Sequence, residues 1–377
     1  MASRSTASAA SVTVGALAPR FPDVDRIVVL PGQGLGDLLF AMPAMQSLVD
    51  AYGASITLLG TPLQAALLDG RPSPVDEVEV LPVARGVHDV RGRDEDPVAT
   101  ARFVDRLAAR HHDLAVQMHG GGRFSNPFVL RLGARHTIGT RTPDAAHLER
   151  TIPYVYYQHE VLRALEVVGL AGAAPTQLEP RLESTAAERA AARERRTAGR
   201  PLVLLHPGAT DPRRQWPAER FAEVAAALAR SGADILVVGA AEDVPAGDEI
   251  VGRAGDVLDP RTASQVRSLA GALDLSELTG VLAEADVLVG NDSGPRHMAQ
   301  AVGTATVGLY LFGNVINAAP LSRTYHRVHA GQMTACPVCG RDVMTAPRCE
   351  HDDSLVADIA AAPVVEDVED LLSRLAP

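Results

Sequence analysis

The stretch RIVVLPGQGLGDLLFAMPAMQSLVDAYGASITLLG, residues 26–60, decides the fold class. An apolar run at 26–31 enters a glycine-rich turn, an amphipathic helix is expected over 36–53, and a second apolar run follows at 54–60. Continuous apolar strands joined by a helix are typical of a parallel sheet covered on both faces. Further strands are expected at 77–82 and 113–118, with helices at 97–111 and near 125–133.

The same alternation restarts in the second half of the chain. A charged, Ala-rich stretch at 182–200 ends at a Gly-Arg-Pro break, and a new strand with a glycine turn is expected at 201–208. The helix expected at 217–232 opens with Pro and closes with Gly. Further strands are expected at 233–240, 285–292 and 305–313, with helices at 275–285 and 294–303.

The length of 377 residues leaves room for two domains, each with its own core. One large doubly wound sheet would also fit the alternation, but ordinary domain sizes favour two similar α/β halves facing a cleft. We therefore expect a disordered tail (1–22), a first domain (23–185), a linker (186–200) and a second domain (201–377). The last helix (364–375) either completes the second domain or packs back on the first.

The charge balance excludes several classes of partner. The chain has 35 basic and 46 acidic residues and a formal net charge of -11, so it lacks the basic footprint of a nucleic-acid binder. Every basic residue is Arg, which excludes lysine chemistry and leaves Arg as the cation for any phosphate contact. No run of about 18 apolar residues occurs, and residues 1–19 do not resemble a signal peptide. We expect a cytoplasmic protein without a transmembrane segment, for which peripheral membrane contact stays open.

The first candidate site is the turn PGQGLGD at 31–37. Its glycines, Gly34 and Gly36 among them, let the backbone turn tightly and approach a ligand. The dinucleotide fingerprint is not met, because Asp37 stands where the third glycine is required and would repel a pyrophosphate. Asp37 either caps the following helix or faces a ligand at the carboxyl end of a parallel strand. The spacing favours neither interpretation.

The second candidate site is HPGATDPRRQWP at 206–217. Arg213 and Arg214 offer planar sets of donors that suit phosphate oxygens, and Thr210 adds a hydroxyl. A solvated basic loop is the alternative. The position of this loop at the end of a strand favours binding.

The third candidate site is VLVGNDSGPRHMAQAVG at 287–303. Free N–H groups near Ser293 and Gly294, together with the positive end of the helix dipole, predict an anion site. Asp292 is placed to accept hydrogen bonds from sugar hydroxyls, and His297 to donate to a phosphate. The alternative is that Asp292 only caps the helix.

The fourth candidate site is the stretch CPVCGRDVMTAPRCEH, which contains all three cysteines. Three thiolates and one imidazole, from Cys336, Cys339, Cys349 and His351, could form a closed tetrahedral zinc site of structural type. Cys349 and His351 are closer in sequence than zinc ligands usually are, which favours reduced, buried thiols. No metal or other cofactor is expected to be required.

Taken together, these stretches resemble the ADP-heptose:lipopolysaccharide heptosyltransferases of glycosyltransferase family 9. The matching pieces are residues 34–48, 206–228 and 274–310, in the family's order within about residues 26–313. The resemblance implies a GT-B fold of two Rossmann-like, doubly wound parallel-sheet domains. It also implies an acceptor on the first domain, a nucleotide-sugar on the second, and metal-independent, inverting transfer.

On the acceptor side, the resemblance assigns a role to the first turn. Asp37 matches the family's carboxylate in the Gly-Asp turn, the general base. The family's Asp-x-Gln-Gly strand end reads QMHGGGR here. His119 and Arg123 are therefore expected to shape the acceptor pocket, together with Gly34 and Gly36.

On the donor side, the resemblance extends to three loops. Arg214 occupies a position that usually holds a lysine contacting the donor phosphate, and Thr210 belongs to the same loop. Asp292 would face the sugar, and the N–H groups that follow it would face the phosphates, with His297 in the same motif. Glu242, after the VVGAAE strand end, sits where a carboxylate would hold the ribose hydroxyls.

The expected function is inverting transfer of a heptose-like sugar from a nucleotide-diphosphate sugar, ADP-heptose under the resemblance, to an acceptor hydroxyl of the lipopolysaccharide core. Three alternatives stay open: a glycosyltransferase with a soluble natural-product acceptor, a nucleotide-sugar epimerase, and a sugar-nucleotide binding protein without turnover. Release of nucleoside diphosphate that depends on acceptor separates the transferases from the other two.

Overall fold

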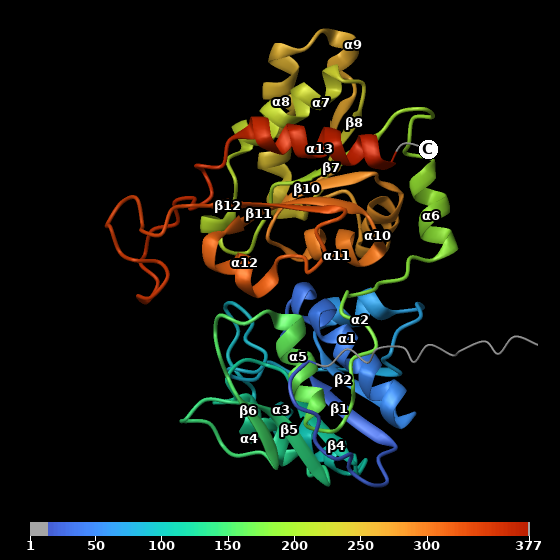
Figure 1. The fold of residues 1–377 in the computed structure, drawn as a ribbon, viewed down its shortest axis with the longest axis vertical. Coiled ribbons are helices and arrows are strands. Elements are labelled where there is room, and N and C mark those ends of the chain that lie inside the picture. The colour runs from blue at the N-terminus through green and yellow to red at the C-terminus, as the bar shows by residue number, and fades with distance from the viewer. Residues whose placement is uncertain (1–13, 376–377) are drawn as a thin grey trace, which may run out of the picture.

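The computed structural model describes residues 14–375, and each half of this chain forms its own six-stranded parallel sheet (Figure 1). In the first half, the N-terminal lobe, the strand order is β3-β2-β1-β4-β5-β6. Ile27 of β1 pairs with Ile56 of β2 on one side and Leu114 of β4 on the other. The elements of this lobe are β1 (Arg26–Leu30), α1 (Leu35–Tyr52), β2 (Ser55–Gly60), α2 (Pro62–Leu68), β3 (Glu77–Val80), α3 (Pro97–Ala108), β4 (Leu114–Gln117), α4 (Ser125–Arg131), β5 (His136–Arg141), β6 (Arg150–Pro153) and α5 (Glu160–Gly169).

In the second half, the C-terminal lobe, the strand order is β12-β11-β10-β7-β8-β9. The connecting helix α6 (Ala186–Arg193) leads into this lobe and packs on α10. The other elements are β7 (Leu202–His206), η1 (Pro212–Arg214), α7 (Ala218–Arg230), β8 (Asp234–Val237), η2 (Ala241–Asp243), α8 (Val244–Val257), α9 (Pro260–Ala263), β9 (Val266–Ser268), α10 (Leu275–Glu284), β10 (Val287–Asn291), α11 (Gly294–Val302), β11 (Ala305–Leu311), α12 (Phe312–Ala318), β12 (His326–Gly331) and α13 (Ala361–Leu375).

The two sheets share one topology. In each, the first strand lies in the middle, the next two strands extend the sheet on one side, and the last three extend it on the other. The strand order therefore reverses between β1 and β4 in one lobe and between β7 and β10 in the other. Ligands of doubly wound sheets bind outside the carboxyl ends of the strands at these reversal points. The glycine turn after β1, the 206–217 loop after β7 and the Asn-Asp-Ser-Gly turn after β10 all lie there.

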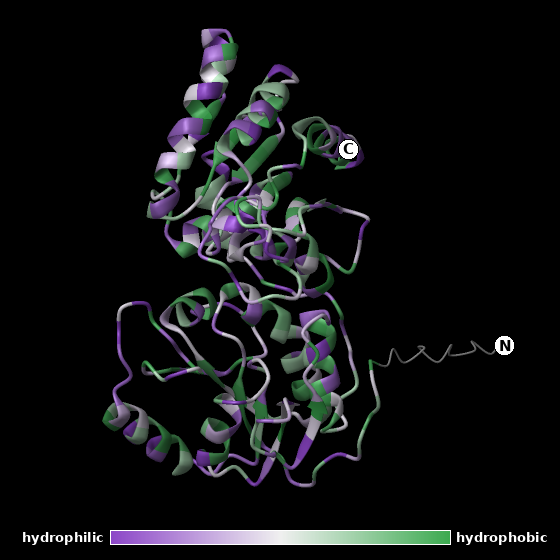
Figure 2. Cartoon of the chain, turned by 90° about the vertical axis from the view of Figure 1, so that its left-hand side faces the viewer, coloured by the Kyte–Doolittle hydropathy of each residue, from purple (hydrophilic) through white to green (hydrophobic). Residues whose placement is uncertain are grey.

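Alternating strand residues build the core on both faces of each sheet. Ile27 and Val29 of β1 pack in a cluster with residues of α1 and α5, whereas Val28 and Leu30 pack with Phe103 of α3 and residues of α4. The first of these clusters continues through α11 into the C-terminal lobe. The core is thus shared between the lobes where α1 meets α11. Figure 2 shows hydrophobic residues along the strands and polar residues on the outer helix surfaces.

Within the described residues, one expectation about the ends of the chain is wrong, and one open alternative is decided. The expected tail includes residues 14–22, but these lie along the N-terminal lobe: Phe21 is buried and stacks on His136, and Arg150 donates to the carbonyl of Pro19. The rest of that tail, residues 1–13, falls outside the described residues. Helix α13 packs on α7, β10 and β11, which makes it part of the C-terminal lobe rather than a return to the first lobe. Within residues 14–375, no helix is long and apolar enough to cross a bilayer.

A buried ion pair ties the two lobes through the connecting helix. Arg71, just after α2, places its guanidinium 2.6 Å from Glu188 of α6, and both side chains are at most 5% exposed. Glu188 also accepts hydrogen bonds from the Thr185 N–H and from the Ser276 hydroxyl of α10. The stretch expected as a linker therefore contains a packed helix. Its Glu188 pairs with Arg71 of the N-terminal lobe and accepts a hydrogen bond from Ser276 of the C-terminal lobe.

We predict that Glu188→Ala lowers the free energy of unfolding by about 3–5 kcal/mol, because it leaves the Arg71 guanidinium buried without its carboxylate. Urea unfolding at pH 7 measures the loss. Glu183→Ala, at an exposed position five residues earlier, is the matched control and should change stability by less than about 0.5 kcal/mol. Equal stability of the two variants would contradict a structural role for the ion pair.

Candidate functional site

The glycine turn after β1 is built around the Asp37 carboxylate. The Gly34 N–H donates to Asp37 Oδ2 at 2.9 Å, which closes the first turn of α1. A Cβ at Gly32 would lie 2.6 Å from Asp37 Cγ, so only glycine lets the carboxyl fold over the turn. Gln64 of α2 donates to the carbonyls of Gly32 and Gly34, both at 2.9 Å. Asp37 therefore caps its helix and also lies at the end of the strand, so the two interpretations of the sequence are compatible.

The Asp37 carboxylate is accessible to solvent, yet protein atoms from both lobes surround it. Loss of surrounding water raises its pKa, and the charge of Asp292 adds to that increase. The hydrogen bond from Gly34 and the neighbouring side chains of His119 and Arg214 oppose the increase without cancelling it. The result is an accessible carboxylate that binds a proton more readily than an ordinary aspartate.

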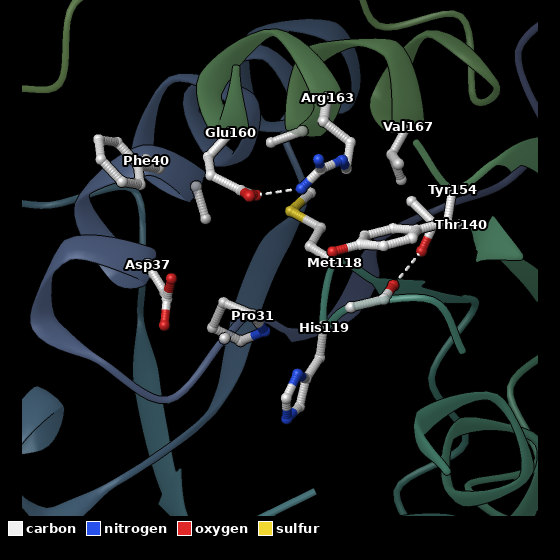
Figure 3. A pocket seen from close by; sticks show the side chains of 14 residues that line it. Pro31, Asp37, Phe40, Met118, His119, Thr140, Tyr154, Glu160, Arg163 and Val167 are labelled. Carbon is white, nitrogen blue, oxygen red and sulfur yellow. Dashed lines mark hydrogen bonds and ion pairs between the residues drawn. The ribbon is translucent and has the colours of Figure 1, made fainter. Parts of the chain in front are cut away.

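A cavity of about 210 Å³ lies directly beside Asp37 (Figure 3). Asp37 and His119 lie toward one side of it, and Tyr154, Glu160 and Arg163 line the other. The last three come from the β6–α5 region, which carries no motif. The cluster of tyrosines before α5 is the only local sequence signal that could have drawn attention to this segment.

Arg163 fixes the far wall of the cavity. Its guanidinium pairs with Glu160, donates to the carbonyl of Val155 at 2.6 Å and lies over the ring of Tyr154 at 4.6 Å. Burial raises the pKa of Glu160, and the charge of Arg163 counteracts this increase. The wall is thus a polar surface whose groups contact one another.

Of the other residues expected on the acceptor side, Arg123 does not line this cavity. Its side chain is exposed, 3.7 Å from Asp144 and stacked on Phe124. Gly36 lies at the boundary between the lobes, where a Cβ would come within 3.0 Å of the His297 ring. This glycine allows α1 to approach α11 closely.

In the C-terminal lobe, the turn after β10 is organised by the buried carboxylate of Asp292. Its Oδ1 accepts from His297 Nε2 at 3.0 Å, and its Oδ2 accepts from Asn314 Nδ2 at 2.6 Å and from Arg214 Nη1 at 3.3 Å. Burial alone would raise its pKa, but the hydrogen bond from His297 and the charges of Arg214 and Arg296 outweigh burial and hold the pKa well below its usual range. Asp292 is therefore an ionised centre with partners on both oxygens.

His297 is also fully engaged. Burial and the neighbouring Arg296 lower its pKa to about 4, so the ring is neutral at pH 7. A neutral ring that donates from Nε2 to Asp292 accepts at Nδ1, where the Arg296 guanidinium lies. The sequence suggested that Asp292 meets the sugar and that His297 donates to a phosphate; in this structure both side chains bond to protein groups. Asn314 and Arg296, which complete the network, were not found from the sequence.

The start of α11 presents the features of an anion site. Ser293 is the N-cap residue, and its hydroxyl pairs with His206 Nδ1 at 3.1 Å instead of with the helix N–H groups. Pro295 has no N–H and the His297 N–H donates to the Ser293 carbonyl, so the N–H groups of Gly294 and Arg296 are the ones left for a ligand, along with the positive end of the helix dipole.

The loop after β7 brings one of its two arginines to the turn between β10 and α11. Arg214 reaches Asp292, whereas Arg213 folds back on Asp211, which accepts from its Nη2 at 2.7 Å. Thr210 is exposed on the same loop. The residue types alone did not separate the two arginines, whereas the family resemblance pointed to Arg214; the difference between them arises from the 3-10 turn η1.

The carboxylate that faces inward after β8 is Asp243 rather than Glu242. Glu242 is exposed, while Asp243 accepts from the Ala240 N–H at 2.9 Å and lies 3.9 Å from His206 Nε2. Burial raises the pKa of Asp243. The two positions are adjacent in the sequence, and only the backbone of η2 distinguishes them.

The two halves of the site meet directly. The ring of Phe40, from α1, packs edge-on against the His297 ring, with centroids 4.6 Å apart. A Cβ at Gly294 would lie 3.2 Å from Leu35 of α1. The Asp37 carboxylate is therefore close enough to Asp292 and Arg214 for their charges to shift its pKa.

A second polar cluster lies apart from this site, in the loop between β12 and α13. The ligand atoms of Cys336, Cys339, Cys349 and His351 all lie within 4.8 Å of one another, a set that could bind a metal. Only Cys336 is buried, so the expectation of three buried thiols is wrong. Hydrogen bonding from the Cys339 N–H lowers the pKa of the Cys336 thiol to about 7.

The fold is that of the two-domain GT-B glycosyltransferases, as expected. The structure of E. coli ADP-heptose lps heptosyltransferase II superposes with a TM-score of 0.71 at 22% identity, covering 94% of this chain and 100% of that one. A glycosyltransferase family 9 structure from Veillonella parvula gives a TM-score of 0.73 at 20% identity, covering 97% and 99%.

The sequence settles the family. Residues 100–342 match glycosyltransferase family 9 (heptosyltransferase), and the chain belongs to this family. It is 30% identical over 185 residues to lipopolysaccharide heptosyltransferase 2 of Salmonella typhimurium. The aligned stretch covers 46% of this chain and 48% of the relative. Such matches span about half the length of these curated relatives.

We predict that stability depends on pH through the buried His206 and His297 and the half-buried His326, because loss of surrounding water lowers the pKa of each to about 4. Between pH 6.5 and 4 the unfolded chain binds protons that the folded chain does not, so the free energy of unfolding rises with pH in this window and levels off above it. Each histidine contributes up to about 1.4 kcal/mol per pH unit to the slope of the unfolding free energy against pH.

Urea unfolding from pH 4.5 to 7.5 measures this slope. His297→Gln should remove about one histidine's share, because glutamine does not titrate in this range, whereas His111→Gln at an exposed position should leave the slope as it is. An unchanged slope in His297→Gln would mean that His297 is already charged in the folded protein.

Proposed function

We propose that this protein transfers a heptose from ADP-heptose to an acceptor hydroxyl of a lipopolysaccharide core saccharide, with inversion at the anomeric carbon. Family membership supports a sugar transfer, and the named relatives support the donor and the acceptor. The observation that carries the mechanism is the accessible Asp37 carboxylate with a raised pKa, opposite a cationic helix N-terminus on the other lobe.

In this mechanism Asp37 is the general base. An acceptor hydroxyl has a pKa far above neutral, so a carboxylate must take its proton as the new C–O bond forms. The raised pKa makes Asp37 a better proton acceptor, and the Gly34 N–H holds one carboxylate oxygen while the other is free to face the hydroxyl. The acceptor sugar would enter the 210 Å³ cavity, with His119, Tyr154 and Arg163 around it.

The leaving nucleoside diphosphate would be stabilised from the C-terminal lobe. As the glycosidic bond breaks, negative charge develops on the phosphate, and the first-turn N–H groups of α11 and the Arg214 guanidinium are the donors that stabilise it. Asp292 and His297 act as positioning residues: the carboxylate aims Arg214, and the ring packs on Phe40 of the opposite lobe. Direct displacement with a single base and no covalent intermediate inverts the anomeric centre.

The function is tested by release of ADP from ADP-heptose. Release that requires a core saccharide acceptor supports the proposal, and analysis of the new linkage gives its stereochemistry. Release without any acceptor would instead favour an epimerase or a hydrolase. Release with small soluble acceptors, and not with core saccharides, would favour the natural-product alternative.

We predict that Asp37→Asn lowers kcat by about 100- to 10,000-fold, the usual contribution of a general base. Asparagine still accepts the Gly34 hydrogen bond but cannot take a proton, so the turn and the affinity for ADP should be preserved within a few fold. Steady-state rates and calorimetric titration with ADP separate the two effects. A collapse of ADP binding in this variant would place Asp37 in the donor site or in the fold instead.

The wild-type pH profile gives an independent check on the same residue. Because the base must be unprotonated, kcat/KM should fall as pH drops through the pKa of Asp37, which lies above the ordinary aspartate value. The acidic limb should therefore begin at a higher pH than for an unperturbed carboxylate. An acidic limb at or below the ordinary value would argue against Asp37.

We predict that Arg214→Ala weakens ADP binding by about 1–3 kcal/mol, as expected for the loss of a hydrogen bond between charged groups. The variant also leaves Asp292 with less neutralisation next to the phosphates. Arg131→Ala removes the same charge from an exposed position on α4 and is the matched control. Equal ADP dissociation constants for the two variants would remove Arg214 from the phosphate site.

A further inference from the structure

The loop between β12 and α13, which projects to the left in Figure 1, has no apolar core of its own. It contains neither helix nor strand, and from Gln332 to Ser354 the only buried residue is Cys336. Loops of this length without secondary structure are uncommon in compact domains unless something else orders them. Small segments that cannot bury apolar surface are usually held by disulfides or by metals.

The backbone of this loop nevertheless adopts a defined turn around the first two cysteines. The Cys336 N–H donates to the carbonyl of Arg341, and the Gly340 N–H donates to the carbonyl of Cys336, both at 2.9 Å. Gly340 has a φ of 70°, the left-handed conformation that glycine adopts without strain. This turn points both sulfurs of the Cys-x-x-Cys pair toward one place.

The other two ligands return to the same place from the far end of the loop. His351 Nδ1 lies 3.6 Å from Cys336 Sγ, and the four candidate ligand atoms are mutually within 4.8 Å. All three cysteines are free thiols. In a tetrahedral zinc site with Zn–S bonds of about 2.3 Å, ligand atoms stand roughly 3.8 Å apart, so movements of about 1 Å or less would complete it.

We propose that Cys336, Cys339, Cys349 and His351 bind one divalent transition metal, of the zinc type, in a closed tetrahedral structural site. Four protein ligands leave no open position, so the metal has no role in the transfer chemistry. Binding displaces the protons of the three thiols, which leave as three H⁺ while no electron is transferred. The proposal does not depend on the identity of the sugar or the acceptor.

The site orders a loop that contacts both lobes. Arg348, next to Cys349, lies 3.6 Å from Asp211, the partner of Arg213 in the loop after β7. On the other side, the hydroxyl of Tyr157 from the N-terminal lobe donates to the carbonyl of Met344 at 2.9 Å. The metal thus fixes a connection between the donor-side loop and the β6–α5 segment that borders the cavity.

Metal analysis of the purified full-length protein is the direct test. After reconstitution with Zn²⁺ under reducing conditions, we expect one metal per chain, and Co²⁺ substitution should give the thiolate charge-transfer and intense d–d absorption of a tetrahedral site. Iron found in the same stoichiometry would support the site with a different ion. Failure of the reduced protein to bind either Zn²⁺ or Co²⁺ would overturn the proposal.

Matched variants locate the site. Cys339→Ser and His351→Ala should lose the metal, His351→Cys should retain it because a fourth thiolate replaces the imidazole, and Val338→Ser, at an exposed position between the ligands, should retain it too. A full complement of metal in both Cys339→Ser and His351→Ala would also overturn the proposal.

Limited proteolysis of the wild-type protein tests the same site without variants, whose folding could differ. Since the chain contains no lysine, trypsin can cut the loop only at Arg341 and Arg348. Chelation should speed cleavage at these two sites by about tenfold or more, because the released loop opens locally while the lobes stay folded. It should also expose three reactive thiols. Equal cleavage rates and equal thiol reactivity with and without chelator would show that no metal orders the loop.

Discussion

The ionised Asp292 carboxylate is the constraint on which the arrangement of the site depends. A buried charge costs several kcal/mol of desolvation unless its oxygens are paired, and every partner of Asp292 is therefore structurally required. Those partners come from three separate elements: Arg214 from η1, His297 from α11 and Asn314 from α12. One carboxylate thus fixes the relative positions of Arg214, the N-terminus of α11 and helix α12.

The same network reaches the opposite lobe. The His297 ring packs on Phe40, and the shared apolar cluster between α1 and α11 continues this contact. Because both sheets have the same strand order, their reversal points present equivalent turns, and the contact between α1 and α11 brings those turns together. The negative charge of Asp292 also contributes to the raised pKa of Asp37. A single buried charge in one lobe therefore helps to tune the proposed base in the other.

Sequence patterns predicted the parts of the fold that rest on local periodicity. The central strands β1, β4, β7 and β10, and helices α1, α7 and α11, were expected within a few residues of where they lie. Strands β5, β6, β9 and β12 were missed. The last three lie at sheet edges and are only partly buried, and β5 reads HTIGTR, without a continuous apolar run. The order of residues 14–22 was also missed, since it depends on Phe21 meeting His136 and Arg150, far along the chain.

The candidate site was also predicted only in part. Glycine turns at strand ends identified Asp37, Arg214 and the start of α11, because position on a doubly wound sheet implies a ligand site. What these side chains contact could not be predicted. Arg214 and Asn314, which pair with Asp292, and the cavity wall around Arg163 come from other segments of the chain. Arg296 is adjacent to His297 in the sequence, but only the structure shows that its guanidinium folds onto the ring. Burial patterns alone do not reveal such pairings.

The arginine-only composition has a physical consequence at this site. The guanidinium groups of Arg163, Arg214 and Arg296 lie half-buried or buried there. A lysine in such surroundings can lose its proton as water is excluded, whereas a guanidinium stays charged at any working pH. Arg214 lies close to Arg296 and the neutral His297 ring. The positive charge of Arg296 makes it less favourable for a neighbouring side chain to carry a proton. Arginine at position 214 therefore keeps the charge that the Asp292 network requires and that, in the proposed mechanism, stabilises the departing diphosphate. Its planar set of donors can serve the carboxylate and a phosphate oxygen at once.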